Sequence, residues 1–153
     1  MSIQTKISTD TLFDGNITCR QHVTGYRYSL DPVLLSHFIT PKRNDAILDL
    51  GAGCGIIMLI LLYRWNGVVE KITGIELQSS LATLAKDNLK ANDYEAQAEI
   101  IEGDIKRIRS LVGAETYQIV VSNPPFYPAD TGRKSSNREA SLARHQVLAN
   151  LDD

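Results

Sequence analysis

Asp49-Leu50-Gly51-Ala52-Gly53-Cys54-Gly55 begins within the last two residues of a short apolar run, residues 46–50. A longer apolar run, residues 56–65, follows it. The short run fits a buried strand, and the longer run, apolar on nearly every side, fits a buried helix. Glycines at alternate positions let backbone amides come close to a ligand, and the following helix directs its positive end toward anionic groups. This stretch therefore predicts a strand, a ligand-binding loop and a helix.

Strand and helix patterns alternate on the C-terminal side of this loop. The apolar runs predict further strands at 72–77, 98–101 and 117–122, and helices at 79–92 and 105–112, the latter ending before Gly113. Such alternation indicates a parallel sheet with right-handed crossovers. We therefore predict an α/β protein with a Rossmann-like, doubly wound fold.

The N-terminal part has a different pattern. The pattern of residues 8–30 predicts short strands with a turn at Phe13–Asn16. A helix is expected over residues 31–39, with Asp31 as N-cap and Pro32 as its first residue. We divide the chain into an N-terminal strand and helix segment, residues 1–40, and a main ligand-binding domain, residues 41–153.

Composition limits the function classes. The 153 residues carry a net charge of −2, so a nucleic-acid partner requires a local basic patch. The polar N-terminus is no signal peptide, and the longest apolar run is too short to span a bilayer. Cys19 and Cys54 are far apart in the sequence, which suits free thiols in the cytoplasm, although the sequence does not exclude a disulfide between them. The three histidines show no metal-type pairing, and we predict no metal site: His22, His37 and His145.

Four chemically distinctive groups follow the four predicted strands: the glycine loop, Glu76, Asp104 and Asn123-Pro124-Pro125-Phe126. Ligands of parallel sheets bind where the strands end. The Glu76 carboxylate can accept hydrogen bonds from ribose hydroxyls. Asp104 can accept a hydrogen bond from an amino group of a ligand, which is the adenine amino group if the cofactor named below binds here, cap the helix that follows it, or do both.

The loop spacing separates cofactor classes. Glycines at 51, 53 and 55 do not match the dinucleotide pattern, and no phosphate-loop Lys-Ser/Thr pair follows. With its preceding acid, the loop resembles the first motif of class I S-adenosylmethionine-dependent methyltransferases. The resemblance implies S-adenosylmethionine as cofactor, bound by Asp49, Gly51, Gly53, Gly55, Glu76, Leu77, Asp104, Ile105 and Asn123. Arg27 and Asp31, in a segment similar to one that closes over the methionine end, are weaker candidates.

The tetrad Asn123-Pro124-Pro125-Phe126 resembles the motif of enzymes that methylate amino nitrogens conjugated to a ring or carbonyl. Such a nitrogen is a poor nucleophile because its lone pair is delocalised. The Asn123 side-chain oxygen and the Pro124 carbonyl can accept its two hydrogens and direct the lone pair at the methyl group. Pro124 and Pro125 together fix the loop so that the carbonyl is already aimed, and Phe126 can stack on the base.

Residues 20–146 resemble bacterial tRNA (adenine-N6)-methyltransferases that modify the adenine beside the anticodon of a valine tRNA. The resemblance rests on the segment 26–31, the glycine loop, Asn-Pro-Pro-Phe-Tyr at 123–127 and Ala-Arg-His at 143–145. It implies a tRNA partner, which the basic segment Arg133–Arg144 could contact unless that segment is only a solvated loop.

Two alternatives stay open. Enzymes that methylate a release-factor glutamine or ribosomal RNA guanine N2 carry similar tetrads, although Phe126 favours a nucleobase. The family fold has seven strands, whereas we count four, so we expect a chain truncated after the fourth strand. Its uncovered sheet edge could self-associate, and the chain could bind cofactor without turnover.

Overall fold

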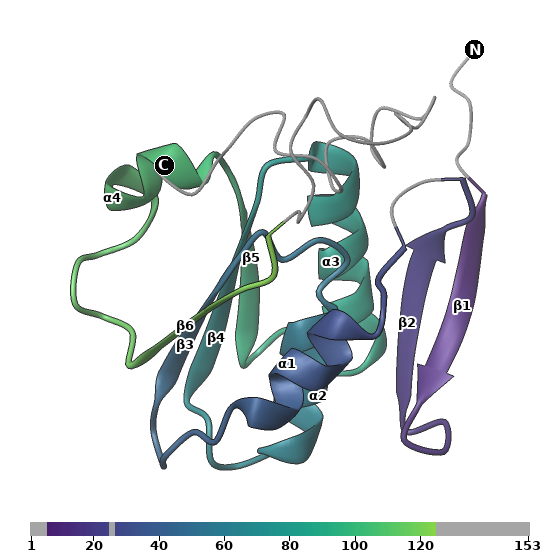
Figure 1. Ribbon diagram of the computed structural model, residues 1–153, viewed down its shortest axis with the longest axis horizontal. Helices are drawn as coiled ribbons and strands as arrows, with labels where there is room; N and C mark the ends of the chain where they lie inside the picture. The colour runs from purple at the N-terminus through teal and green to yellow at the C-terminus, as the bar shows by residue number, and fades with distance from the viewer. Residues whose placement is uncertain (1–5, 25–26, 125–153) are drawn as a thin grey trace.

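The computed structural model describes residues 6–24 and 27–124 (Figure 1). In chain order the elements are β1 (Ile7–Leu12), β2 (Ile17–His22), α1 (Asp31–Phe38), β3 (Ala46–Leu50), α2 (Ile56–Arg64), β4 (Lys71–Glu76), α3 (Ser79–Ala91), β5 (Ala98–Glu102), the 3-10 helix η1 (Ile105–Arg107), α4 (Ile108–Leu111) and β6 (Ile119–Ser122).

The main sheet has four strands in the order β5-β4-β3-β6, and all of its pairs are parallel. This confirms the predicted α/β fold, because each crossover runs through the predicted helical segments. β1 and β2 form a separate antiparallel hairpin, which lies beside the helices (Figure 1). The carboxyl ends of the four parallel strands meet at one edge of the sheet.

Three local predictions were wrong. The first helix begins at Asp31, not after it, and the Asp31 carboxylate accepts from Ser29 Oγ (2.7 Å) and does not cap the helix. The helix expected at 105–112 is split into η1 and α4. The fourth strand begins at Ile119, two residues later than predicted; just before it, Gln118 N donates to Ala46 O (3.0 Å) and Ala46 N donates to the Gln118 side-chain oxygen (2.8 Å).

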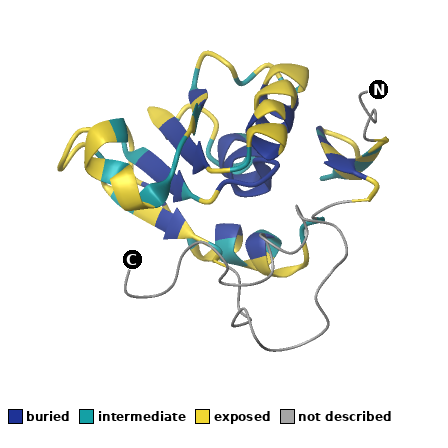
Figure 2. Ribbon diagram, turned by 90° about the horizontal axis from the view of Figure 1, so that it is seen from above, coloured by how far each residue is buried: buried dark blue, intermediate teal, exposed yellow. Residues whose placement is uncertain are grey.

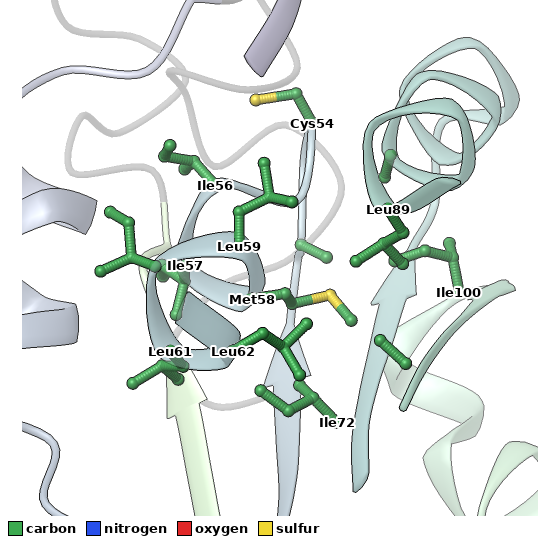
Figure 3. Packing of buried hydrophobic residues seen from close by; sticks show 14 of the residues in the cluster. Cys54, Ile56, Ile57, Met58, Leu59, Leu61, Leu62, Ile72, Leu89 and Ile100 are labelled. Carbon is green, nitrogen blue, oxygen red and sulfur yellow. The ribbon is translucent and has the colours of Figure 1, made fainter. Parts of the chain in front are cut away.

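Helix α2 forms the centre of the hydrophobic core. All seven residues from Ile56 to Leu62 are buried, as expected for a helix that contacts α1, α3 and β2 (Figure 2). Figure 3 shows Met58 of α2 directed toward Leu89 of α3 and Ile100 of β5. The helix therefore holds the hairpin and the sheet in one apolar cluster.

β6 pairs with β3 and, among the described strands, with no other. Val120 on this strand is 59% exposed. Self-association through this edge stays a prediction. Within the described ranges, no helix is long and apolar enough to cross a bilayer.

Gly74 in the middle of β4 sets the spacing between sheet and helix. A Cβ at this position would lie 2.7 Å from Met58 Sδ, 2.7 Å from Ile100 Cδ1 and 2.9 Å from Ala52 Cβ. The Ala52 methyl group cannot rotate away, so the backbone itself would have to move.

We expect Gly74→Ala to lower the free energy of unfolding by about 1 to 3 kcal/mol, the usual cost of overpacking a core. Urea denaturation measures this change. Gly113→Ala is the control, because its Cβ would meet only the Thr116 side chain on the surface (3.1 Å to Cγ2), and it should stay within about 0.5 kcal/mol of the wild type. Equal stability of the two variants would contradict the packing argument.

Candidate functional site

The structure brings the predicted groups to one edge of the sheet. β3 is a central strand, and its last residue, Leu50, is in register with Ile75 of β4 and with Ser122 of β6. The glycine loop after β3 therefore starts between Glu76 on one side and Asn123 on the other. Asn123 is half-buried, and Ser122 Oγ donates to Leu50 O (2.9 Å). Pro125 and Phe126 lie outside the described residues.

The glycine loop takes a left-handed backbone conformation at each glycine. The φ angles are +78° at Gly51, +58° at Gly53 and +84° at Gly55, which explains the choice of residue. A Cβ at Gly51 would meet nothing within 4 Å, so this turn presents open backbone at the sheet edge. At Gly55, by contrast, a Cβ would lie 3.4 Å from Ala85 Cβ, which shows that α2 begins against α3.

Glu76 holds the loop in place. Its Oε2 accepts from Gly53 N (2.8 Å), and its Oε1 accepts from Gln78 N (2.8 Å). The side chain is 6% exposed. The carboxylate therefore ties the glycine loop to the end of β4, a structural role that the sequence did not predict.

Asp49 is the most unusual group of the site. The residue is fully buried, and among the described residues neither side-chain oxygen has a hydrogen-bond partner. Burial, and then the nearby carboxylate of Glu76, raise the pKa of Asp49 to about 7. Buried polar groups normally find partners, so two unpartnered oxygens near the carboxyl end of β3 could accept from a hydrogen-bond donor outside the described residues.

Asp104 and Ile105 lie at the end of the neighbouring strand. Asp104 Oδ1 accepts from Lys106 N (2.9 Å), which confirms the predicted helix cap. Gly103 N donates to Glu76 O (3.0 Å), so the turns after β4 and β5 are adjacent. Leu77, directly after Glu76, is 41% exposed at this edge.

The weaker candidates have other partners. Arg27 forms an ion pair with Asp10 of the hairpin (2.9 Å). Asp31 is exposed and bonded to Ser29. The basic segment 133–144 lies outside the described residues.

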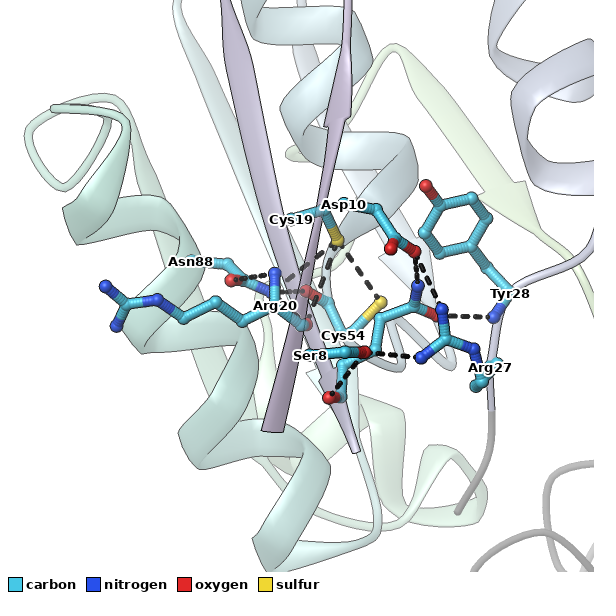
Figure 4. A network of polar contacts seen from close by, with 9 residues as sticks. Ser8, Asp10, Cys19, Arg20, Arg27, Tyr28, Cys54 and Asn88 are labelled. Carbon is cyan, nitrogen blue, oxygen red and sulfur yellow. Dashed lines mark hydrogen bonds and ion pairs between the residues drawn. The ribbon is translucent and has the colours of Figure 1, made fainter. Parts of the chain in front are cut away.

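Sequence reasoning missed Asn88. This side chain of α3 is fully buried, and its Nδ2 donates to Cys54 O of the glycine loop (2.9 Å) (Figure 4). The available signal was an asparagine inside the apolar stripe of the helix, since position 88 follows Leu84 and Ala85 by one helical turn.

The residues fit a nucleoside ligand with an amino-acid tail. Such a ligand offers hydroxyl and amino donors, and the edge supplies carboxylates at Asp49, Glu76 and Asp104 around the open turn at Gly51. The unpartnered Asp49 is the observation that favours a donor-rich ligand here. S-adenosylmethionine has this composition.

Solved structures share the fold. An RNA methyltransferase from Salinibacter ruber in complex with S-adenosyl-L-homocysteine superposes with a TM-score of 0.51 at 21% identity, covering 63% of this chain and 59% of that chain. A SAM-dependent methyltransferase from Thiobacillus denitrificans, also with S-adenosyl-L-homocysteine, gives 0.50 at 21% identity, over 65% and 38% of the two chains.

Two curated relatives are both named tRNA1(Val) (adenine(37)-N6)-methyltransferase. The Porphyromonas gingivalis protein is 33% identical over 132 residues, covering 82% of this chain and 50% of the relative. The Haemophilus influenzae protein is 28% identical over 132 residues, covering 86% and 55%. The chain thus spans about half the length of these relatives.

The fold is that of the class I S-adenosylmethionine-dependent methyltransferases. The sequence model of the methyltransferase small domain family matches residues 31–143, most of the chain. The protein belongs to that family, and its cofactor is S-adenosylmethionine.

The buried Asp49 carboxyl predicts a specific pH dependence of stability. Because its pKa is about 7 in the folded state and 3.8 ordinarily, the folded state holds the proton more tightly. Unfolding then releases a proton between about pH 4 and 7, so this group lowers stability as pH rises through that range and adds no further change above it.

Asp49→Asn removes this titration. We expect its free energy of unfolding, relative to wild type, to rise by a few kcal/mol between pH 4.5 and 8, since one pKa unit is worth about 1.4 kcal/mol. Chemical denaturation at several pH values measures the difference. If the free energy of unfolding depends on pH in the same way for both proteins, the pKa of Asp49 is not raised in the folded state.

Proposed function

We propose that the protein transfers the methyl group of S-adenosylmethionine to the exocyclic N6 of an adenine in tRNA. The observation that carries this proposal is the position of Asn123 and Pro124. They directly follow β6, whose last residue Ser122 is in register with Leu50, immediately before the open turn at Gly51. A polar acceptor pair therefore stands beside the cofactor loop.

In the proposed reaction, the Asn123 side-chain oxygen and the Pro124 carbonyl accept the two hydrogens of the adenine amine. This draws the nitrogen toward a tetrahedral form with its lone pair free. Pro125 limits movement of the loop, and Phe126 stacks on the base. The cofactor supplies an activated methyl group on a sulfonium, so the chain's own task is orientation, and a strong general base is unnecessary.

The cofactor-binding roles follow the order of the strands. We assign Glu76 and Leu77 to the ribose region, Asp104 and Ile105 to the adenine, and Asp49 with Gly51, Gly53 and Gly55 to the methionine end. Glu76 is already engaged with Gly53 N and Gln78 N. Ribose binding would therefore be coupled to the geometry of the glycine loop.

The relatives support RNA as the substrate, because both are named for a tRNA adenine. In this proposal the segment Arg133–Arg144 contacts RNA phosphates, and the target base leaves its stack in the anticodon loop. Acting on tRNA, the protein would work in the cytoplasm. Glutamine of a release factor and guanine N2 of ribosomal RNA are the competing acceptors, and cofactor binding without turnover is the competing activity.

Transfer of labelled methyl to unmodified valine tRNA, ribosomal RNA and release factor tests the substrate. We expect label in the tRNA adenine. We expect Asn123→Ala to lower the rate at least a hundredfold without changing the dissociation constant of S-adenosylhomocysteine, because a transition-state contact is lost. Asn66→Ala, an exposed turn position, is the control. Label in the release factor alone would overturn the tRNA assignment.

A second prediction concerns Glu76. Glu76→Gln should raise the dissociation constant of S-adenosylhomocysteine about tenfold or more, because charge-assisted hydrogen bonds to the loop and the ribose become neutral ones. Calorimetry measures the constant. Glu102→Gln is a matched control, since Glu102 is in register with Glu76 on β5 but exposed. Equal effects of both substitutions would exclude a specific role of Glu76.

A further inference from the structure

Helix α3 and its C-cap residue, Asn92, hold the hairpin by side-chain amides. Asn92 Oδ1 accepts from Thr18 N (2.9 Å), and Asn92 Nδ2 donates to Thr18 O (2.8 Å). Asn88 repeats this pattern with Arg20, at 2.8 and 3.0 Å. Residues two apart in a strand direct their backbone groups to the same side, and residues four apart in a helix share a face. The two asparagines thus form the kind of hydrogen bonds with β2 that the backbone of a neighbouring strand would form.

Asn88 makes one contact that Asn92 lacks. Its Nδ2 also donates to Cys54 O (2.9 Å), so both amide hydrogens are used, one on the hairpin and one on the glycine loop (Figure 4). Cys54 lies between Gly53 and Gly55, whose left-handed conformations shape the loop. A single side chain therefore links β2, the cofactor loop and α3.

Two buried cysteines lie next to Asn88. Cys19 of β2 and Cys54 of the loop are both buried and free, with their sulfurs 3.8 Å apart. The hydrogen bond between these thiols, and burial, raise the pKa of Cys19, so the Cys19 thiol stays neutral. Hairpin and loop therefore meet directly next to the Asn88 amide.

The residue type is informative in itself. Position 88 lies in the buried stripe of α3 with Leu81, Leu84, Ala85 and Leu89, where an apolar side chain would suit the helix better. Burying an amide is unfavourable unless its hydrogen bonds are made. Asn88 therefore has a positional role that packing alone does not require.

We propose that Asn88 is a positioning residue for S-adenosylmethionine: it fixes the carbonyl of Cys54, and with it the glycine loop, in the binding conformation, and it couples that loop to the β1–β2 hairpin. The cofactor does not need to touch Asn88. The proposal rests on the glycine loop as the cofactor site and is independent of which acceptor is methylated.

Asn92→Ala is the matched control for Asn88→Ala. Each variant loses two hydrogen bonds to β2, and we expect both to lower the melting temperature by a similar amount. Only Asn88→Ala should weaken the binding of S-adenosylhomocysteine. We expect its dissociation constant, measured by calorimetry, to rise about tenfold, the equivalent of one hydrogen bond. Asn92→Ala should stay within twofold of wild type. Equal weakening by both variants, or none by Asn88→Ala, would overturn the proposal.

Asn88→Asp provides a second test that does not depend on the stability of the alanine variant. Its protonated carboxyl keeps one acceptor and one donor, whereas the ionised form opposes the carbonyls of Cys54 and Arg20. The dissociation constant of Asn88→Asp relative to wild type should therefore fall by about tenfold from pH 8 to pH 5.5. A ratio that does not change with pH would overturn the role of the donor. A wild-type chain that binds no S-adenosylhomocysteine would overturn the cofactor site itself, before any variant is compared.

Discussion

The site depends on the attachment of the glycine loop to the end of β4. Gly51 N and Ala52 N both donate to Ile75 O (2.9 and 3.0 Å), and Gly53 N donates to the carboxylate of Glu76 (2.8 Å). Three successive amides are thus held by one neighbouring strand. The loop can only have this form if β3 and β4 are parallel and in register. The chemistry of the site therefore depends on the order of the strands in the sheet.

This attachment concentrates negative charge. Glu76 is fixed by two backbone amides, and the buried Asp49 stands near it without a hydrogen-bond partner in the described part of the chain. Burial, and then the charge of Glu76, raise the pKa of Asp49 to about 7 and so favour its neutral form. A ligand that brings hydrogen-bond donors or positive charge relieves this situation, as S-adenosylmethionine does.

Much of the fold could be predicted from the sequence because its signals are local. The apolar runs at 46–50 and 56–65, and the glycines between them, specify strand, loop and helix within about twenty residues. The caps were less predictable: Asp104 caps η1, whereas Asp31 bonds to Ser29 instead. The hairpin attachment could not be predicted, because Asn88 and Asn92 meet Arg20 and Thr18 across 68 and 74 residues. The unpartnered state of Asp49 likewise depends on burial by distant elements, not on its neighbours in the chain.

The amide contacts along β2 also affect how accessible this strand edge is to other chains. A strand edge with free backbone groups is a template on which a foreign strand can add, and many proteins protect such edges with charges, bulges or prolines. Here the outward backbone groups of Thr18 and Arg20 already bond to the side chains of Asn92, the C-cap of α3, and of Asn88 within α3. Among the described residues these two asparagines, and not a further strand, use the hydrogen-bonding groups on this side of β2, which leaves fewer of them for a foreign strand.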